Sequence, residues 1–306
     1  MLNTCNFACT YCVSEDTSDI PLANTLQNYT EQTLSPEDLT RLIAAVHRIN
    51  RLKSVRLTGG EPLLYKNLDV LINNIHKIGI EDIRLTTNAY YLKGKAQRLF
   101  DAGVKSVNIS VDAIDKDLFK KISRHPDPSR VFEGIEAAVK TGMNVKLNAV
   151  IMRDENDSQI IPLLDYATSL GIKIRFLELM KMGHLYQSKN GHFFPESEIL
   201  DVIKAKYEIE ELPRKHAETA NYWKTSMDGI FGIIANESSP FCHDCNRLRM
   251  DSTGTFYGCL SNANGNKLAP FIHDESLLTE KLHELLLLKQ AVKFHGSKLS
   301  MRNIGG

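Results

Sequence analysis

Between about residues 35 and 180 the chain alternates regularly between stretches of helical periodicity and short β-like runs. Ser35 can cap a first helix that has Pro36 at its first helical position and extends to Asn50. Repeated strand–helix units predict an α/β fold with a parallel sheet, either open or closed into a barrel. Further helices are expected at 68–78, 93–102, 129–141 and 158–170, and strands at 54–58, 83–86, 104–111, 144–151 and 173–177.

Polar and glycine-rich residues follow several of these expected strands. They are Gly59-Gly60-Glu61-Pro62, Thr86-Thr87-Asn88, Ser110, Asp112 and the segment 178–180. In parallel α/β folds, ligands bind at the C-terminal ends of the strands. The sequence therefore predicts a binding site along this rim.

The alternation fades after about residue 205, and only a helical stretch at 275–294 stands out beyond it. A chain of 306 residues with 42% hydrophobic residues can form one large barrel with an appendage, or two modest domains. We expect a barrel over residues 1–205 and a smaller region packed against it over residues 206–306.

The formal net charge is zero, because Lys plus Arg and Asp plus Glu both number 37. Nothing in this balance favours nucleic acid or an anionic membrane as a partner, so any anion site must come from a local cluster of cations. No apolar run approaches the roughly 20 residues of a membrane-spanning helix. The N-terminus lacks the layout of a secretory signal. We expect a soluble, cytoplasmic protein.

The six cysteines form two triplets, the first of which is Cys5, Cys9 and Cys12 with the spacing C-x3-C-x2-C. In a reducing cytoplasm, clustered cysteines are more often metal ligands than disulfides. Three thiolates can hold three corners of a 4Fe–4S cube and leave the fourth iron open for a chelating small molecule such as S-adenosylmethionine (SAM). The alternative is a structural zinc site, which would usually need a fourth Cys or His.

This spacing, with the aromatic Tyr11 before the last cysteine, resembles the signature of the radical SAM superfamily. Gly59-Gly60-Glu61-Pro62 is similar to the family's glycine-rich loop, which contacts the SAM amino group. The resemblance implies a partial TIM-type β/α barrel. It also implies one-electron cleavage of SAM to a 5′-deoxyadenosyl radical that abstracts hydrogen from a substrate.

The second triplet is Cys242, Cys245 and Cys259, and Arg247 and Arg249 follow its first pair. A guanidinium group is well suited to binding phosphate through two hydrogen bonds. One interpretation is a second open cluster beside a phosphorylated substrate. The other is a zinc ribbon with two ordinary surface arginines.

The whole arrangement resembles the GTP 3′,8-cyclase family of molybdenum cofactor biosynthesis. The likeness runs through residues 57–63, 85–88, 108–112, 146–148 and 175–180, the second triplet and the terminal Ile304-Gly305-Gly306. It implies a radical SAM lyase with two 4Fe–4S clusters that converts GTP to (8S)-3′,8-cyclo-7,8-dihydroguanosine 5′-triphosphate. In that reaction, hydrogen is taken from C3′ of the ribose and the carbon radical attacks C8 of guanine.

The resemblance assigns roles by position, with Cys5, Cys9 and Cys12 on the catalytic cluster and Cys242, Cys245 and Cys259 on the second. Tyr11, Gly60, Ser110 and Met180 would contact SAM. Arg56, Thr86, Lys146, Arg175, Arg247, Leu248 and Arg249 would contact GTP, and the Gly305-Gly306 tail would reach the catalytic site. Taken singly, each has a plainer explanation: a surface charge for Lys146 and Arg175, a capping hydroxyl for Thr86 and Ser110, a core position for Tyr11 and Met180, and a flexible end for the glycines.

Three features depart from the family pattern. Only four residues precede Cys5, where the family has a strand and a GTP-contacting arginine. Either the barrel begins without that strand or an upstream segment is missing, and we expect the latter. Ser54 stands where many members have a basic residue. Ala89 replaces a glycine, which removes easy access to a positive φ.

Two other functions remain open: a two-cluster radical SAM enzyme of another type, such as a peptide-modifying maturase, and an inactive metal-binding relative. The family further implies a homodimer and a downstream partner, cyclic pyranopterin monophosphate synthase.

Overall fold

The computed structural model describes residues 3–14, 33–188, 191–261, 264–287 and 294–304. Its main sheet has eight strands in the order β1-β2-β3-β4-β5-β8-β7-β6. Strands β1 to β5 and β8 are parallel, whereas β7 and β6 continue the sheet in antiparallel pairing. The strands are β1 (Val55–Leu57), β2 (Ile83–Thr87), β3 (Val104–Ser110), β4 (Asn144–Ile151), β5 (Lys173–Glu178), β6 (Ile209–Leu212), β7 (Asn221–Thr225) and β8 (Ile230–Ile234).

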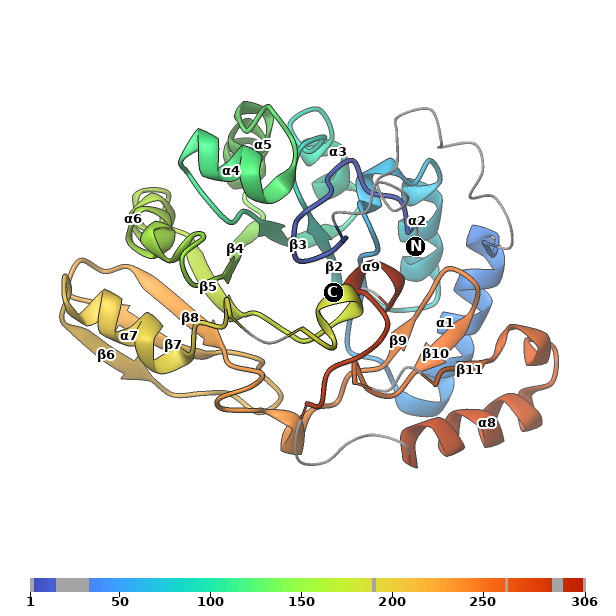
Figure 1. The fold of residues 1–306 in the computed structure, drawn as a ribbon. Coiled ribbons are helices and arrows are strands. Elements are labelled where there is room, and N and C mark those ends of the chain that lie inside the picture. The colour runs from blue at the N-terminus through green and yellow to red at the C-terminus, as the bar shows by residue number, and fades with distance from the viewer. Residues whose placement is uncertain (1–2, 15–32, 189–190, 262–263, 288–293, 305–306) are drawn as a thin grey trace.

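The strand–helix alternation predicted from the sequence is confirmed. In Figure 1, α2 to α6 follow the outside of the curved sheet, whereas the N-terminal loop and α9 lie on its concave side. The α-helices are α1 (Pro36–Asn50), α2 (Leu68–Lys77), α3 (Ala96–Asp101), α4 (Lys116–Ser123), α5 (Ser129–Lys140), α6 (Ile160–Ser169), α7 (Glu196–Lys204), α8 (Glu275–Leu287) and α9 (Met301–Ile304). Short 3-10 helices are η3 (Pro62–Leu64), η4 (Asp157–Gln159), η5 (Gly183–Leu185), η6 (Cys242–Asp244) and η7 (Ala269–Phe271).

The two faces of the parallel strands differ in polarity, because their side chains alternate with period two. The outer face is apolar and packs under the helices, with Leu85, Val107, Leu147 and Phe176 at most 1% exposed. The inner face of β1 to β5 is mainly polar, with Val150 and Leu177 as apolar residues near the strand ends. By strand register it carries Arg56, Arg84, Thr86, Ser106, Asn108, Ser110, Lys146, Asn148 and Arg175. A polar inner face lines a site rather than filling a closed core.

The sheet does not close on itself, which confirms a partial barrel of the α/β class. The predicted division at residue 205 falls after α7, but the main sheet continues beyond it because β8 pairs with β5. Residues 206–234 therefore extend the barrel sheet. The separate C-terminal sheet begins later, with the order β11-β10-β9. It consists of β9 (Arg249–Met250), β10 (Thr255–Tyr257) and β11 (Asn266–Lys267).

Helix α1 connects the barrel to this C-terminal region. Ser35 caps it, since its Oγ accepts a hydrogen bond from the Asp38 amide at 3.0 Å. One side of α1 packs on the barrel through Leu39 and Ile43. The other side, which includes Leu42, packs against Phe256 of β10 and Leu282 of α8. The same pairing of α1 with α8 and β9 to β11 is visible in Figure 1.

Among the described residues, no helix combines the length and apolar character needed to span a membrane.

Candidate functional site

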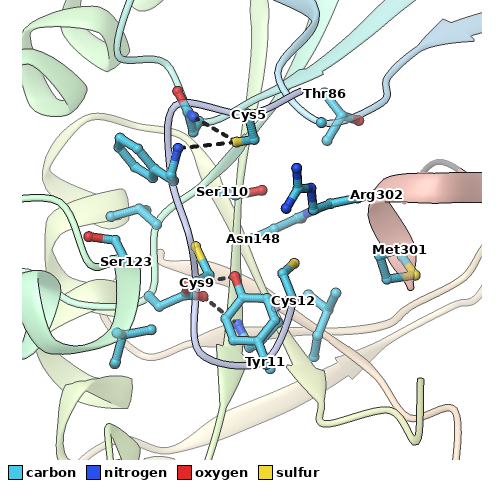
Figure 2. A pocket seen from close by; sticks show the side chains of 18 of the residues that line it. Cys5, Cys9, Tyr11, Cys12, Thr86, Ser110, Ser123, Asn148, Met301 and Arg302 are labelled. Carbon is cyan, nitrogen blue, oxygen red and sulfur yellow. Dashed lines mark hydrogen bonds between the residues drawn. The ribbon is translucent and has the colours of Figure 1, made fainter. Parts of the chain in front are cut away.

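The C-terminal ends of β1 to β5 surround one cavity that the N-terminal loop and α9 also line (Figure 2). This is the rim that the sequence predicted. Its lining includes Cys5, Cys9, Tyr11, Cys12, Gly60, Glu61, Thr86, Asn88, Ser110, Asp112, Asn148, Glu178, Met180, Met301 and Arg302.

The loop that carries the first three cysteines is held against α4. Backbone amides of Ala8 and Thr10 donate to the carbonyls of Ser123 and Ile122 at 3.1 and 2.9 Å. The ring of Phe7 packs edge-on against Phe119, with centroids 5.8 Å apart. These contacts fix the loop with its sulfur atoms toward the cavity.

The three thiols lie close enough to influence one another electrostatically. Burial raises the pKa of Cys5 to about 11 and that of Cys12 to about 12, and it raises the pKa of Cys9 well above its ordinary value. Thiolates at these positions therefore need a compensating positive charge. The Sγ of Cys5 also accepts N–H bonds from the Phe7 amide at 3.4 Å and from Asn88 Nδ2 at 3.7 Å.

Three facing cysteines with N–H donors to sulfur fit an iron–sulfur cluster, whose irons would supply that charge. Within the described residues, no three His, Cys, Asp or Glu side chains gather in the arrangement of a single-ion site. A 4Fe–4S cube takes its thiolates at separate corners, so it places them farther apart than one ion does.

The loop after β1 approaches the cysteine loop closely at Gly60. A β-carbon at this position would lie 2.1 Å from the Thr4 carbonyl oxygen. The next amide, that of Glu61, donates to the same oxygen at 2.8 Å. The Glu61 carboxylate, 1% exposed, accepts hydrogen bonds from Thr87 Oγ1 at 2.6 Å and the Asn88 amide at 2.8 Å. Gly60 and Glu61 thus join the cysteine loop to the end of β2.

Five cations act on one another electrostatically beside this cavity: Arg56, Lys146, Arg175, Arg247 and Arg249. Arg56 and Arg175 connect the group to the cavity, because they donate to Thr86 and Asn148 of its lining. Burial, together with nearby Arg175, lowers the pKa of Lys146 to about 8. Burial and the neighbouring arginines likewise lower the pKa values of Arg56 and Arg249 to about 10 each. This mutual repulsion marks a site that an anion would stabilise.

Two polar side chains, Asn148 and Tyr222, hold the guanidinium group of Arg175. Its Nε donates to Asn148 Oδ1 at 2.9 Å, and the side chain is buried. Its Nη2 atom has no hydrogen-bond partner in the part of the chain that the structure describes. A buried donor without a partner is costly, so it too indicates a ligand.

The second cysteine triplet flanks the first two strands of the C-terminal sheet: Cys242 and Cys245 precede β9, and Cys259 follows β10. Burial, together with Cys259 and Cys245, raises the pKa of Cys242. Arg247 Nη1 donates to Cys245 Sγ at 3.6 Å, and the Ser261 amide donates to Cys259 Sγ at 3.4 Å. The donor set again suits an iron–sulfur cluster.

An ion pair fixes the loop between Cys242 and Cys245. Asp244 accepts two hydrogen bonds from Arg214, both at 2.8 Å, and one from the Ala217 amide at 2.8 Å. The Ala217 carbonyl in turn accepts a bond from Arg247 Nη2 at 2.5 Å. The second cysteine loop and Arg247 are therefore held by the same segment, residues 214–217.

The remaining predicted site residues are placed as follows. Ser110 ends β3, Met180 follows β5, and Thr86 lies on β2, where its Oγ1 accepts a bond from Arg56 at 3.3 Å. The Leu248 side chain packs against the apolar cluster around Leu42. Gly305 and Gly306 lie outside the described residues.

Ala89 adopts the positive φ that its β-carbon was expected to disfavour. Its φ is +61° despite the β-carbon, and it is fully buried. Its amide donates to Thr87 Oγ1 at 3.0 Å and its carbonyl accepts from Leu92 at 2.9 Å. These bonds hold the left-handed turn that the family makes with glycine. The left-handed conformation costs a residue with a β-carbon about 1–2 kcal/mol.

Several residues with contacts at the site had no assigned role in the sequence prediction: Asp112, Asn148, Arg214, Asp244 and Arg302. Asp112 and Asn148 belong to motifs that were noted, and their positions at strand ends could have indicated a role. Arg302 lies almost the whole chain away from Cys5, and no local pattern connects the two.

Comparison with known proteins agrees with this arrangement. The family model for the radical SAM superfamily matches residues 1–167, and that for Molybdenum Cofactor Synthesis C matches residues 172–297. The GTP 3′,8-cyclase of Staphylococcus haemolyticus is 39% identical over 297 residues, covering 92% of this chain and 83% of the relative. That of Staphylococcus aureus strain MRSA252 is 39% identical over 289 residues, covering 92% and 82%.

Two solved structures share the fold at low sequence identity. SuiB of Streptococcus suis, bound to its precursor peptide SuiA, has a TM-score of 0.61 at 17% identity, over 90% of this chain and 64% of SuiB. The structure of anSMEcpe with bound AdoMet has a TM-score of 0.60 at 15% identity, over 94% and 81%. The chain therefore belongs to the radical SAM superfamily and, within it, to the family of the GTP 3′,8-cyclases.

Proposed function

We propose that this protein converts GTP to (8S)-3′,8-cyclo-7,8-dihydroguanosine 5′-triphosphate, the first step of molybdenum cofactor biosynthesis. The observation that carries the proposal is the group of five cations beside the cysteine-lined cavity. Arg175 is buried and the other four cations are half-buried. In a chain with no net charge, such a concentration of cations suits a polyanion such as a triphosphate.

Membership of the radical SAM superfamily implies a 4Fe–4S cluster and SAM. Cys5, Cys9 and Cys12 would hold that cluster, and Tyr11, Gly60, Ser110 and Met180 would contact SAM. When bound, the cluster and SAM supply the one-electron cleavage that begins hydrogen abstraction. The chain itself binds and orients the reactants and excludes water from the cavity.

On the substrate side, Arg56, Lys146, Arg175, Arg247 and Arg249 would neutralise the triphosphate. Thr86 connects this group to the cysteine-lined cavity, because it lines that cavity and its hydroxyl accepts a hydrogen bond from Arg56. The open Nη2 of Arg175 would donate to a phosphate oxygen. These contacts would place the ribose at the boundary between the cations and the cavity.

We further propose a second 4Fe–4S cluster on Cys242, Cys245 and Cys259, which would orient the guanine base. The support is the donor set and the N–H bonds to two of its sulfur atoms. Gly305 and Gly306 would complete the catalytic site. The family assignment also supports a cytoplasmic homodimer that passes its product to cyclic pyranopterin monophosphate synthase.

The double substitution Arg247→Ala and Arg249→Ala tests the substrate assignment. Anaerobic binding of GTP should be lost, whereas the first cluster and SAM binding should be retained. A matched control is Arg41→Ala with Arg98→Ala, which removes two arginines from exposed ion pairs with Asp38 and Asp69. Unchanged GTP affinity in the Arg247/Arg249 variant would rule out GTP binding by these arginines.

A further inference from the structure

The acidic and the basic side chains that line the cavity beside the first cysteine triplet differ in their hydrogen-bond partners. Among the described residues lining it, the carboxylates are Glu61, Asp112 and Glu178, and Arg302 is the one Lys or Arg. Each carboxylate accepts hydrogen bonds from protein groups, including the amides of Asn88, Val150 and Glu196. The acids are therefore satisfied within the protein.

Arg302 has no such partner of opposite charge within the described part of the chain. Its Nε and Nη2 both donate to one neutral acceptor, the carbonyl oxygen of Asn3, at 3.0 and 2.9 Å. Asn3 lies two residues before Cys5. These two bonds hold the guanidinium group beside the cysteine loop while leaving its positive charge uncompensated.

The C-terminal segment holds Arg302 in this place. The amide of Gly183 donates to the carbonyls of Ser297 and Leu299 at 2.9 and 3.2 Å. Ile304, on α9 with Arg302, is buried among Met182 and Tyr257. Arg302 is thus preorganised, so little conformational entropy would be lost when it binds a ligand.

Arg302 points toward the sulfur atoms of the first cysteine triplet (Figure 2). Its charge acts on both Cys5 and Cys12, opposing the effect of burial on their pKa values. A ligand group bound by Arg302 would therefore lie next to the cluster position.

We propose that Arg302 binds the carboxylate of SAM. SAM carries an ammonium, a sulfonium and a single carboxylate, and a guanidinium group binds a carboxylate through charge-assisted hydrogen bonds. The bonds to Asn3 leave Nη1 without a partner among the described residues. SAM would then link the C-terminal helix to the segment that precedes Cys5.

Binding of two ligands to the cluster-loaded protein, measured anaerobically without GTP, tests this proposal. The ligands are SAM and decarboxylated SAM, and the variants are Arg302→Gln and the control Lys298→Gln. Lys298 is exposed on the same C-terminal segment, so its substitution removes an equal charge without touching the cavity. Iron content and the electron paramagnetic resonance spectrum of the reduced cluster report whether each variant is correctly loaded.

Arg302→Gln should weaken SAM binding about tenfold to a hundredfold relative to the wild type. The same substitution should leave the affinity for decarboxylated SAM unchanged, since that ligand lacks the group Arg302 binds. Lys298→Gln should change neither affinity. An equal loss for both ligands would show that Arg302 only shapes the cavity, and an unchanged SAM affinity would also overturn the proposal. Neither result bears on GTP, which is absent from the measurement.

Discussion

The hydroxyl group of Tyr11 donates a hydrogen bond to Asp112 Oδ2 at 2.7 Å and so ties the cysteine loop to the end of β3. The other carboxylate oxygen, Oδ1, accepts the backbone amide of Val150 at 2.8 Å. Asp112 is 8% exposed. One side chain of the loop therefore fixes the position of Cys9 and Cys12 relative to two neighbouring strands.

Tyr11→Phe removes this bond without changing the ring. The buried Asp112 carboxylate then loses a donor, so the free energy of unfolding should fall by about 1–3 kcal/mol. Release of iron to a chelator should also become faster. The control is Tyr91→Phe, because Tyr91 is 36% exposed. If both variants unfold and release iron like the wild type, the bond does not position the loop.

The carboxyl group of Glu61 gives the fold a pH dependence. Burial raises its pKa from 4.5 to about 7, so the folded state binds a proton more tightly than the unfolded state does. Between about pH 4.5 and 7, stability should therefore fall as pH rises, by about 3 kcal/mol in total. Denaturant unfolding of the wild type and Glu61→Gln across this range measures the difference. A difference that is constant with pH, or that grows in favour of the wild type, would contradict this.

Gly60→Ala places a β-carbon only 2.1 Å from the Thr4 carbonyl oxygen. The cysteine loop must shift, and overpacking of this kind costs about 1–3 kcal/mol. The amount of iron bound by Cys5, Cys9 and Cys12 should fall together with the free energy of unfolding. Gly94→Ala is the matched control, because nothing lies within 4 Å of its β-carbon position. Equal stability of the two variants would show that the close approach at Gly60 is not required.

The ion pair of Asp244 with Arg214 should stabilise the second cluster without affecting the first. Asp244→Asn weakens the bonds to Arg214 and frees the loop between Cys242 and Cys245. Iron should drop from about eight to about four atoms per chain as the second of two 4Fe–4S clusters is lost. SAM binding should persist. As a control, Asp228→Asn removes an exposed ion pair with Lys224. Retention of all the iron in Asp244→Asn would refute this role.

Local patterns in the sequence predict most of the barrel. The caps and glycines around α1, α2 and α5 and the short β-like runs of β2 to β5 are local signals. Each of these elements was found within a few residues of its predicted range. Helices α4 and α7, of eight and nine residues, were not predicted from the sequence. Strands β6 to β8 were missed because β6 is exposed and their place in the sheet depends on pairing with β5.

The candidate site was predictable where its residues lie at strand ends or in cysteine motifs. The polar inner face has a sequence signal that was not used, since Arg56, Arg84, Lys146 and Arg175 alternate with apolar neighbours. Buried parallel strands are usually apolar on both faces, so this alternation indicates a lined site. Contacts such as Arg302 with Asn3 and Arg214 with Asp244 join distant segments, and only the folded chain brings them together.

Anaerobic turnover of the cluster-loaded protein with SAM, GTP and a strong reductant tests the proposed cyclase activity most directly. Mass spectrometry should find 5′-deoxyadenosine together with (8S)-3′,8-cyclo-7,8-dihydroguanosine 5′-triphosphate, both depending on GTP. 5′-Deoxyadenosine without a cyclised nucleotide would retain the radical SAM chemistry but contradict GTP as the substrate. Neither product, from protein with both clusters loaded, would contradict the proposed activity of this chain.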